Sequence, residues 1–523
     1  MSFRSILFDQ SGPWSDSAPA SGPESGTAVD GQGAPDFFTD LRLDKVVASI
    51  TAGRERYRLG PFFHAPLTSE EAIAYRHEVF RDLEDPALLG VVRSFARQMQ
   101  LMRDHLARGA ASHYRFERAR WFLDAVDVYC TAVTGLADGL TASQPRSRGF
   151  QGLRDYLVAA IASDEFGALQ AETRALEADL DRITYLLQIE GARVRVSRYE
   201  PAPDYSADVA QTFEKFRQGE AKEYRFDFSS GSHMNHVEAA ILDLVARLHP
   251  EVFEALDRFH GRHQHYLDET IGRFDREVQF YVAYLEYIER FRPAGLAFCY
   301  PTVTSRSKEI RARAVFDLAL AEMLVAEQAP VVTNDFHLAG PERILVVSGP
   351  NQGGKTTFAR TVGQLHHLAR LGCPVPGVDA RLFLVDRIFT HFEREEDLQS
   401  LTGKLEEDLR RIHRILEQAT PASLLIMNES FGSTTLNDAL FLNRAVMEAI
   451  IRRDLLCVSV TFLDELSTLG ETTVSMVATV DPHDPARRTF RIVRRPADGL
   501  AYAWAIAEKY RLTYEEIKAR IAR

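Results

Sequence analysis

A glycine-rich segment at residues 349–356 constrains the fold of this chain more than any other feature. It reads GPNQGGKT, which fits the pattern G-x-x-x-x-G-K-[S/T], and it lies between an apolar run at 343–348 and a stretch compatible with a helix. Glycines let several backbone N–H groups turn toward one anion, and the amino end of a helix adds partial positive charge. Because motif and context agree, the segment predicts a strand, a phosphate-binding loop and a helix.

The residue types in this loop suggest separate tasks in binding a nucleotide. Lys355 can reach the β and γ phosphates of ATP, and the hydroxyl of Thr356 can ligate Mg²⁺. We therefore expect ATP and Mg²⁺ as cofactors. The residues of the loop that we predict to bind the nucleotide are Gly349, Pro350, Asn351, Gln352, Gly353, Gly354, Lys355, Thr356 and Thr357.

A second apolar run, at 423–427, ends in two polar residues that are candidates for catalysis. Glu429 can orient and polarise the water that attacks the γ phosphate, which makes it the predicted catalytic residue. Asn428 stands where an aspartate is usual in such sites. Its amide can hold a Mg²⁺-bound water but adds no negative charge. We therefore expect ATP hydrolysis to ADP and phosphate, with weaker metal binding or slower turnover than an aspartate would give.

The pattern along the chain predicts a multidomain protein. Residues 1–36 are expected to form a disordered leader, because Pro, Gly, Ser and Ala dominate from residue 11 onward. Residues 37–294 are expected to be a mainly α-helical core and lever, with one helix beginning at Thr68 or Ser69. From 295 to 523, β-branched runs alternate with helical stretches, as in an α/β domain with a parallel sheet.

Two long apolar stripes in the helical region predict the arms of an extended hairpin. They run over residues 161–189 and 253–288, and their apolar residues recur mostly every three or four positions. Such stripes are typical of helices packed as a coiled coil. Between them, residues 192–196 and 223–228 alternate with period two, which predicts a small clamp-like tip of strands near 192–230. A loop without strands is the alternative for this segment.

Composition limits the surroundings and partners of the chain. The formal net charge is −12 with a pI near 5.8, which disfavours a protein that coats nucleic acid with its whole surface but leaves a local basic surface open. The four cysteines are scattered without a C-x-x-C pair, which favours a reducing compartment, and we expect the cytoplasm. We expect no membrane contact, because no apolar run reaches the roughly 18 residues that span a bilayer.

The site segments resemble those of the MutS family of DNA mismatch-repair ATPases. Residues 349–357 resemble its GPNMGGKST loop, with Gln352 in place of methionine, and residues 428–438 resemble its DE-x-GRGTST-x-DG segment. Residues 386–390 resemble its DRIFTR segment. Asn334 and the aspartate after it resemble its P-N-D segment near the adenine, so the resemblance adds Asn334 to the predicted nucleotide contacts. The similarity is firm over about residues 330–470.

The resemblance implies a homodimer in which a serine-bearing loop of one subunit completes the ATP site of the other. The matching stretch is 397–404, where Gly403 falls at the position of the signature serine. Three side chains of the stretch could replace that serine: Ser400, Thr402 and Lys404. Phe462 stands where the family has a histidine, and it cannot form a hydrogen bond with a γ phosphate.

The resemblance further implies an ATP-dependent DNA-binding protein, in which the nucleotide switches a dimeric clamp on structured or damaged DNA, duplex or branched. Direct mismatch reading is not expected, because only the leader precedes the helical region. Other repair proteins remain open as partners. The acidic balance favours an alternative, a regulatory ATPase that grips a protein and no nucleic acid. A third class, a kinase, is disfavoured by the similarity of the segment that begins at Asn428.

Overall fold

Contacts divide the chain into two compact units. The computed structural model describes residues 3–9, 33–191, 193–200, 234–393, 403–484 and 487–497, together with 514, 517 and 518. The first unit is built from Leu83–Arg146 and Phe150–Asp275, with the extreme amino end, and the second from Arg4–Asp82, Ser147–Gly149 and Arg276–Arg523. The fold is therefore mixed, with a helical unit and a unit that is mainly α/β.

This division differs from the predicted boundary at residues 294 and 295. The early helices join the α/β unit because they share buried contacts with the helix that follows the glycine-rich loop. Gln364 on that helix donates to the carbonyl of Leu41 at 2.9 Å, and His367 contacts the carbonyl of Phe63 at 2.8 Å. Buried polar groups need such partners, so these bonds fix residues 37–64 to the α/β unit.

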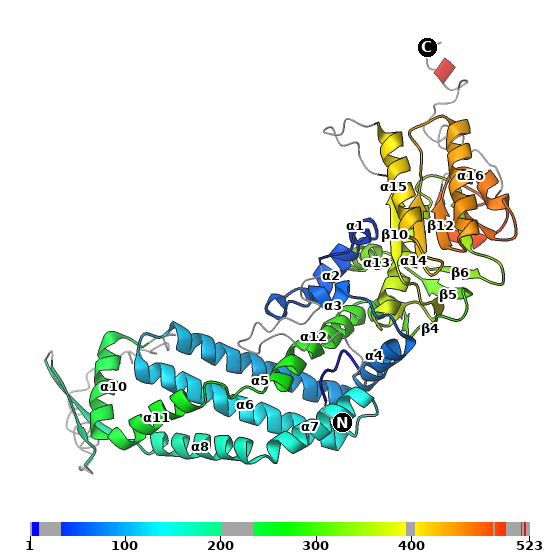
Figure 1. Cartoon of the computed structure of the whole chain (residues 1–523). Helices are drawn as coiled ribbons and strands as arrows, with labels where there is room; N and C mark the ends of the chain where they lie inside the picture. Colours follow the sequence, from blue (N-terminus) through cyan, green and yellow to red (C-terminus); the bar gives the residue numbers. More distant parts are fainter. Residues whose placement is uncertain are drawn as a thin grey trace. The chain divides into compact units, whose positions relative to one another are not determined.

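The described residues of the first unit are helical except for one hairpin and the connecting turns. Its two longest helices, α5 (Pro86–Ala111) and α6 (Arg115–Ser143), lie side by side, and α8 (Asp164–Asp181) packs along α6 (Figure 1). The carboxylate of Asp85 accepts from the N–H of Ala87 and so caps the start of α5. The remaining helices are α7 (Arg148–Ile161), α10 (His236–Leu248) and α11 (Pro250–Arg262).

The two predicted arms are shorter and more divided than expected. Helix α8, which carries the first stripe, ends at Asp181. The last residues of the stripe belong to strand β1 (Tyr185–Glu190), which pairs antiparallel with β2 (Arg193–Arg198). The alternating residues favour a strand here because one face of the hairpin packs on α10. The second stripe is split into α11 and α12 (Glu269–Glu289). Most of the predicted tip, including 223–228, lies outside the described residues.

A six-stranded sheet forms the centre of the second unit. Its order is β10-β11-β12-β7-β13-β14, and all neighbours are parallel except β13 and β14. The strands predicted at 343–348 and 423–427 are confirmed as β7 and β11, and β12 lies between them in the sheet. The bounds of the six strands are β7 Ile344–Ser348, β10 Ile388–Phe392, β11 Leu424–Asn428, β12 Leu456–Val460, β13 Thr473–Val480 and β14 Arg488–Arg494.

Helices cover both faces of this sheet. Leu425 and Met427 of β11 belong to a core cluster with α15 (Lys404–Gln418) and α16 (Leu436–Arg452). Ile426, which points to the other face, lies against α14 (Lys355–Arg370), where a Cβ at Gly363 would be 2.6 Å from its Cδ1 atom. Successive side chains of a strand point to opposite faces of the sheet. A strand that is buried on both faces therefore needs a continuous apolar run.

Outside the six-stranded sheet and its helices, the described residues of the second unit form small sheets and short helices. A four-stranded sheet has the order β4-β9-β5-β6, and β3 pairs with β8. Their bounds are β3 Phe298–Cys299, β4 Thr302–Thr304, β5 Ile310–Val315, β6 Asn334–Leu338, β8 Val375–Pro376 and β9 Asp379–Phe383. The helices are α1 Phe37–Asp40, α2 Leu43–Thr51, α3 Gly60–His64, α4 Glu70–Asp82 and α13 Leu318–Ala326, with 3-10 turns at Glu55–Tyr57, Arg292–Ala294 and Asp464–Thr468.

Part of the expected disordered leader is instead buried. The backbone of residues 5–8 is held by side chains of α4 and α12: Tyr75 and Tyr281 donate to the carbonyls of Ser5 and Ile6 at 2.8 and 2.7 Å. Glu277 accepts from the hydroxyl of Ser5 at 2.7 Å. These bonds and the buried apolar side chains of the segment stabilise its ordered state. Residues 10–32 of the predicted leader lie outside the described residues.

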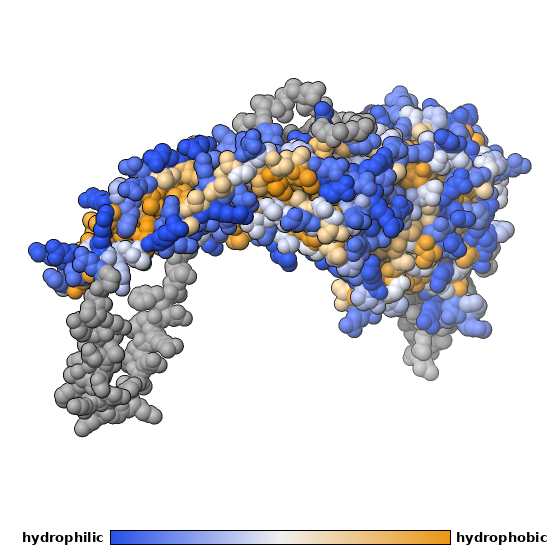
Figure 2. All heavy atoms as spheres, turned by 90° about the horizontal axis from the view of Figure 1, so that it is seen from below, coloured by the Kyte–Doolittle hydropathy of each residue, from blue (hydrophilic) through white to orange (hydrophobic). Residues whose placement is uncertain are grey.

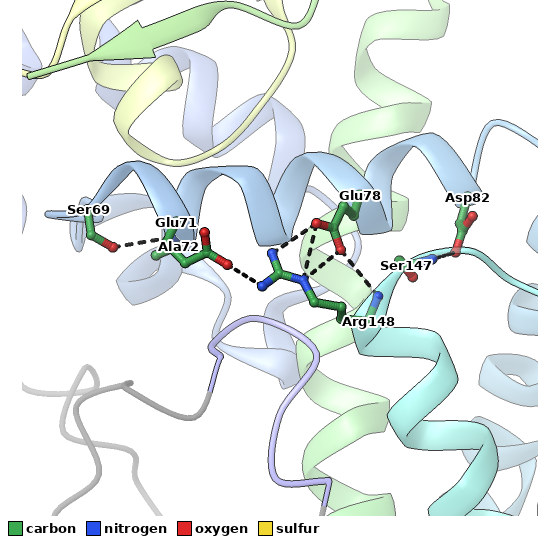
Figure 3. A network of polar contacts seen from close by, with 7 residues as sticks. All are labelled: Ser69, Glu71, Ala72, Glu78, Asp82, Ser147 and Arg148. Carbon is green, nitrogen blue, oxygen red and sulfur yellow. Dashed lines mark hydrogen bonds and ion pairs between the residues drawn. The ribbon is translucent and has the colours of Figure 1, made fainter. Parts of the chain in front are cut away.

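Helix α4 begins where the sequence predicts and anchors the start of α7. The hydroxyl of Ser69 accepts from the N–H of Ala72 at 3.1 Å, as an N-cap does. Figure 3 shows Arg148 reaching across to Glu71 and Glu78 of this helix, while Asp82 accepts from the N–H of Ser147 at 2.7 Å. These exposed charges fix a chain reversal, although each pair adds little stability by itself.

Hydrophilic residues cover most of the described surface in view in Figure 2, and the apolar ones form smaller patches between them. The four cysteines are all unpaired thiols: Cys130, Cys299, Cys373 and Cys457. Among the described helices, none is both long and apolar enough to cross a membrane.

Candidate nucleotide-binding site

The glycine-rich loop joins the end of β7 to the start of α14, as predicted. Gly349 has a φ of 114°, and a Cβ there would lie 2.8 Å from the carbonyl oxygen of Ala478. Gly354, with a φ of 91°, precedes the first residue of α14. Any side chain at Gly349 would meet both the neighbouring strand and an unfavourable backbone conformation. The loop therefore needs these glycines to curl back over the amino end of the helix.

Lys355 lies inside this loop and is only 5% exposed. Its Nζ atom is 3.0 Å from the carbonyl of Gly349, 3.2 Å from that of Pro350 and 3.4 Å from Oδ1 of Asn351. Burial lowers the pKa of Lys355, and the carboxylate of Glu429, with Oε1 3.9 Å from Nζ, opposes that shift. The ammonium group is thus held among oxygens of the loop, and an anion entering the loop would compete with these oxygens for it.

The two predicted metal ligands are brought together by different elements. Thr356 is the second residue of α14, Asn428 is the last residue of β11, and the hydroxyl of Thr356 donates to Oδ1 of Asn428 at 2.8 Å. Hydroxyl and amide oxygens are hard ligands of the kind that suits Mg²⁺. The donor set therefore fits Mg²⁺, but neither group supplies a negative charge.

Glu429 follows β11 directly and is fixed through its backbone. Its N–H donates to the carbonyl of Val460 at 2.9 Å. Its φ is 53°, and that of Phe431 is 60°, so two residues without glycine's freedom lie in the left-handed region. The buried ring of Phe431 belongs to the core cluster beneath the sheet. Strained backbone of this kind persists where packing holds it, and it often accompanies functional sites.

Asn334, the predicted contact near the adenine, uses its side-chain amide within the protein. Its Nδ2 donates to the carbonyl of Phe490 at 3.2 Å, and its Oδ1 accepts from the N–H of Ile492 at 2.7 Å. Asn334 therefore ties β6 to β14 and holds Phe490 in place. Its direct contact with a nucleotide stays a prediction.

Two residues of β14 also lie beside the loop, although neither is among the predicted catalytic, nucleotide-binding or metal-binding residues. Phe490 is 49% exposed and lies 3.8 Å from where a Cβ of Gly354 would be. Arg488 donates from Nε to the carbonyl of Asn351 at 3.2 Å. In the sequence both residues belong to a late strand without a motif, so only the pairing of β14 with β13 shows that they reach the loop.

Some of the positions that depart from the resemblance lie among the described residues and others lie outside them. Phe462 is exposed just after β12, and the hydroxyl of Thr461 accepts from the N–H of Leu463 at 3.0 Å. Residues 397–402 belong to the stretch that is predicted to complete the ATP site of a second subunit, and they lie outside the described residues. Gly403 precedes α15, and the Nζ of Lys404 lies 2.6 Å from a carboxylate oxygen of Glu393. The contribution of this loop to a second subunit stays a prediction.

Residues 345–490 match the protein-family model described as MutS domain V. The Endonuclease MutS2 of Thermus thermophilus is 31% identical over 189 residues, which cover 36% of this chain and 25% of that protein. The DNA mismatch repair protein MutS of Chlorobaculum tepidum is 32% identical over 206 residues, which cover 38% of this chain and 23% of that protein.

A third relative, the DNA mismatch repair protein MutS of Chloroflexus aurantiacus, is 36% identical over 122 residues, which cover 23% of this chain and 13% of that protein. The chain thus spans a quarter or less of the length of these relatives. The match to MutS domain V includes the loop and β11 with its polar end, and it ends at Phe490. Residues 345–490 therefore match MutS domain V, and the chain is similar to proteins named MutS and MutS2 over 23–38% of its length.

Proposed function

We propose that this chain is an ATPase that couples ATP binding and hydrolysis to a grip on DNA. The observation that carries the proposal is the convergence of Lys355, Thr356 and Asn428 at the carboxyl edge of the sheet, with Glu429 next to them. These four side chains come from two elements and provide a cation, two metal-ligand oxygens and a base. This set suits hydrolysis of a nucleoside triphosphate.

In this proposal each residue has a separate task. The backbone N–H groups of the loop receive the phosphates, and Lys355 exchanges the carbonyls of Gly349 and Pro350 for phosphate oxygens. Glu429 orients the attacking water and accepts its proton. Phe490 offers an exposed ring beside the loop on which the adenine can stack. Mg²⁺, when bound by Thr356 and, directly or through water, by Asn428, supplies charge neutralisation to the phosphates.

DNA is the proposed partner for two reasons. Two of the three relatives described above are named DNA mismatch repair proteins and the third an endonuclease. In addition, Arg193, Arg195 and Arg198 of β2 are exposed, and the alternation of a strand places Arg193 and Arg195 on one face. Guanidinium groups on a narrow hairpin can contact phosphates even though the whole chain is acidic.

We further propose that the chain acts as a homodimer in the cytoplasm, with ATP switching a clamp on structured or damaged DNA. A protein partner in place of DNA remains the second candidate, because the formal net charge of −12 disfavours wide contact with a polyanion. Both versions share the same nucleotide site and differ in what the hairpin contacts.

A filter-binding titration separates the two candidates. Duplex, branched and single-stranded DNA would be tested over a range of salt concentrations, with the double variant Arg193→Ala and Arg195→Ala beside the native chain. Contacts with phosphates predict a steep loss of affinity with salt and a smaller salt slope in the variant, by about one for each lost contact. If no DNA binds at low salt, the DNA version is wrong and the protein-partner version is left.

A further inference from the structure

A cleft in the second unit lies at the edge of the sheet opposite to the phosphate loop. The loop follows the carboxyl end of β7, whereas the cleft includes residues 386–390 at the amino end of the parallel strand β10, together with one side of α15. Its volume is about 590 Å³. This is within the range of pockets that bind small molecules.

Arg370, the last residue of α14, lines this cleft and is 5% exposed. Its Nη2 donates to the carbonyl of Asp386 at 2.7 Å, whereas its buried Nε has no hydrogen-bond partner among the described residues. Burial lowers the pKa of Arg370 to about 10, so the group stays charged at neutral pH. A buried charged donor without an acceptor is costly, and an anion in the cleft would stabilise it.

Two more arginines of the cleft are available to such an anion. Arg387 and Arg414 line it and are exposed, and neither forms an ion pair with another described residue. Arg411 also lines the cleft, but its charge is already used, because its Nη2 lies 3.2 Å from Oδ2 of Asp40 and donates to the carbonyl of Thr390 at 3.0 Å. A phosphate group accepts from several guanidinium groups at once, which a carboxylate does less well.

The other lining groups limit the size and character of the ligand. Asp36 and Glu407 are exposed acidic residues that line the cleft. The carboxylate of Asp386 also lines it and accepts hydrogen bonds from two hydroxyl groups of the loop before β11. These negative charges would repel an extended polyanion such as duplex DNA. Phe37 and Phe389 provide apolar surface. This combination suits a single phosphate group attached to an apolar or aromatic part.

We propose that this cleft binds a small phosphate monoester of about nucleotide size through Arg370, Arg387 and Arg414. The site is separate from the phosphate loop, because α14 extends for 16 residues from Lys355 to Arg370, roughly 24 Å at 1.5 Å per residue. A ligand at Arg370 would therefore contact the far end of the helix whose amino end forms the phosphate loop.

The test uses AMP as the probe and isothermal titration calorimetry of the full chain. The phosphate loop is first saturated with a non-hydrolysable ATP analogue and Mg²⁺, so that AMP reports the cleft. Saturable binding of one AMP per chain is expected. Arg387→Ala and Arg414→Ala should each weaken it about tenfold or more, the loss that follows removal of a charge-assisted hydrogen bond.

Arg410→Ala is the matched control, because Arg410 lies on the same helix, pairs with Glu406 at 2.6 Å and does not line the cleft. Arg370→Met should abolish AMP binding. If that variant does not fold, the affinities of Arg387→Ala and Arg414→Ala for AMP test the proposal. The proposal is overturned if AMP gives no saturable heat, or if Arg410→Ala weakens binding as much as Arg414→Ala. AMP binding no tighter than that of inorganic phosphate would also overturn it, because the apolar wall would then contribute nothing.

Discussion

The hydroxyl of Thr356 donates a hydrogen bond to the side-chain oxygen of Asn428 across 2.8 Å. This bond joins the helix of the phosphate loop to the strand that precedes Glu429. The residue after the loop lysine and the residue before the catalytic candidate thus meet where a divalent cation would bridge phosphate and protein. Neither side chain of this pair carries a negative charge that would strengthen the binding of such a cation.

Replacing Asn428 with aspartate should strengthen Mg²⁺ binding. The variant adds a negative charge 2.8 Å from the hydroxyl of Thr356 without a change in side-chain size. We expect the Mg²⁺ concentration for half-maximal phosphate release to fall on the order of tenfold, with faster turnover. Asn235→Asp, the same change at the exposed N-cap of α10 in the first unit, is the control. An unchanged Mg²⁺ dependence in Asn428→Asp would remove Asn428 from the metal site.

Glu429→Gln should keep ATP binding and slow hydrolysis. The amide preserves the shape of the side chain but cannot accept a proton, so a loss of about 10²–10⁴-fold in turnover is expected for a general base. Single-turnover phosphate release measures it, and nucleotide affinity is measured in parallel. Glu471→Gln changes an exposed acid elsewhere in the unit and should behave as the native chain does. Native turnover in Glu429→Gln would show that another group activates the water.

Phe490→Ala should weaken ATP binding without affecting the hydrolysis step. Loss of a stacked base contact costs about 1–3 kcal/mol, and the exposed ring beside Gly354 is the aromatic group placed to provide it. Phe462→Ala removes another half-exposed ring, just after β12, and should have the smaller effect. Asn334→Ala should reproduce part of the loss, because Asn334 holds the backbone of Phe490. Equal affinities in all three variants would contradict this placement of the adenine.

Tyr281→Phe should destabilise the second unit. The phenol is buried and donates to the carbonyl of Ile6, and its removal leaves that carbonyl without its partner at a cost of about 1–3 kcal/mol. Thermal unfolding measures the effect, and Tyr199→Phe at an exposed position is the control. A melting temperature equal to that of the native chain would mean that residues 5–8 do not dock in solution as the structure describes.

Acid should destabilise the protein between about pH 6.5 and pH 4. Burial, and after it the charge of Arg411, lower the pKa of His391 to about 4, while Asp408 lies 3.6 Å from its Nε2. The unfolded state binds the proton more readily, so stability is complete above about pH 6.5 and is lost as the pH falls toward 4, by on the order of 3 kcal/mol for this group. His391→Gln should flatten that part of the curve of unfolding free energy against pH. A curve as steep as that of the native chain would assign the effect to other groups.

The parts of the fold that the sequence predicts are those in which local pattern and burial agree. Strands β7, β11 and β12 are buried on both faces, so their apolar runs stand out from their surroundings. The arms were less predictable, because Leu186 and Leu187 continue a helical stripe by spacing alone, whereas their pairing with Ser197 and Val196 places them in a hairpin. A stripe does not show where a helix ends when the next segment is also apolar.

Site residues that lie in short sequence motifs were predictable, whereas those brought to the site by strand pairing were not. Lys355, Thr356, Asn428 and Glu429 lie in short motifs, and the parallel order of β7, β12 and β11 brings them to one edge of the sheet. Phe490 and Arg488 reach the loop only because β14 pairs antiparallel with β13, which no local pattern shows. The segment at residues 5–8 was missed because its polar partners, Tyr75, Glu277 and Tyr281, are far away in the sequence.

The most direct test of this account is steady-state phosphate release from ATP by the purified full chain and by Lys355→Ala, with nucleotide binding measured on the same samples. We expect measurable release by the native chain, and loss of both release and tight ATP binding in Lys355→Ala, because no other group of the loop supplies its buried positive charge. A native chain that neither binds nor hydrolyses ATP would contradict the account, as would full activity in Lys355→Ala.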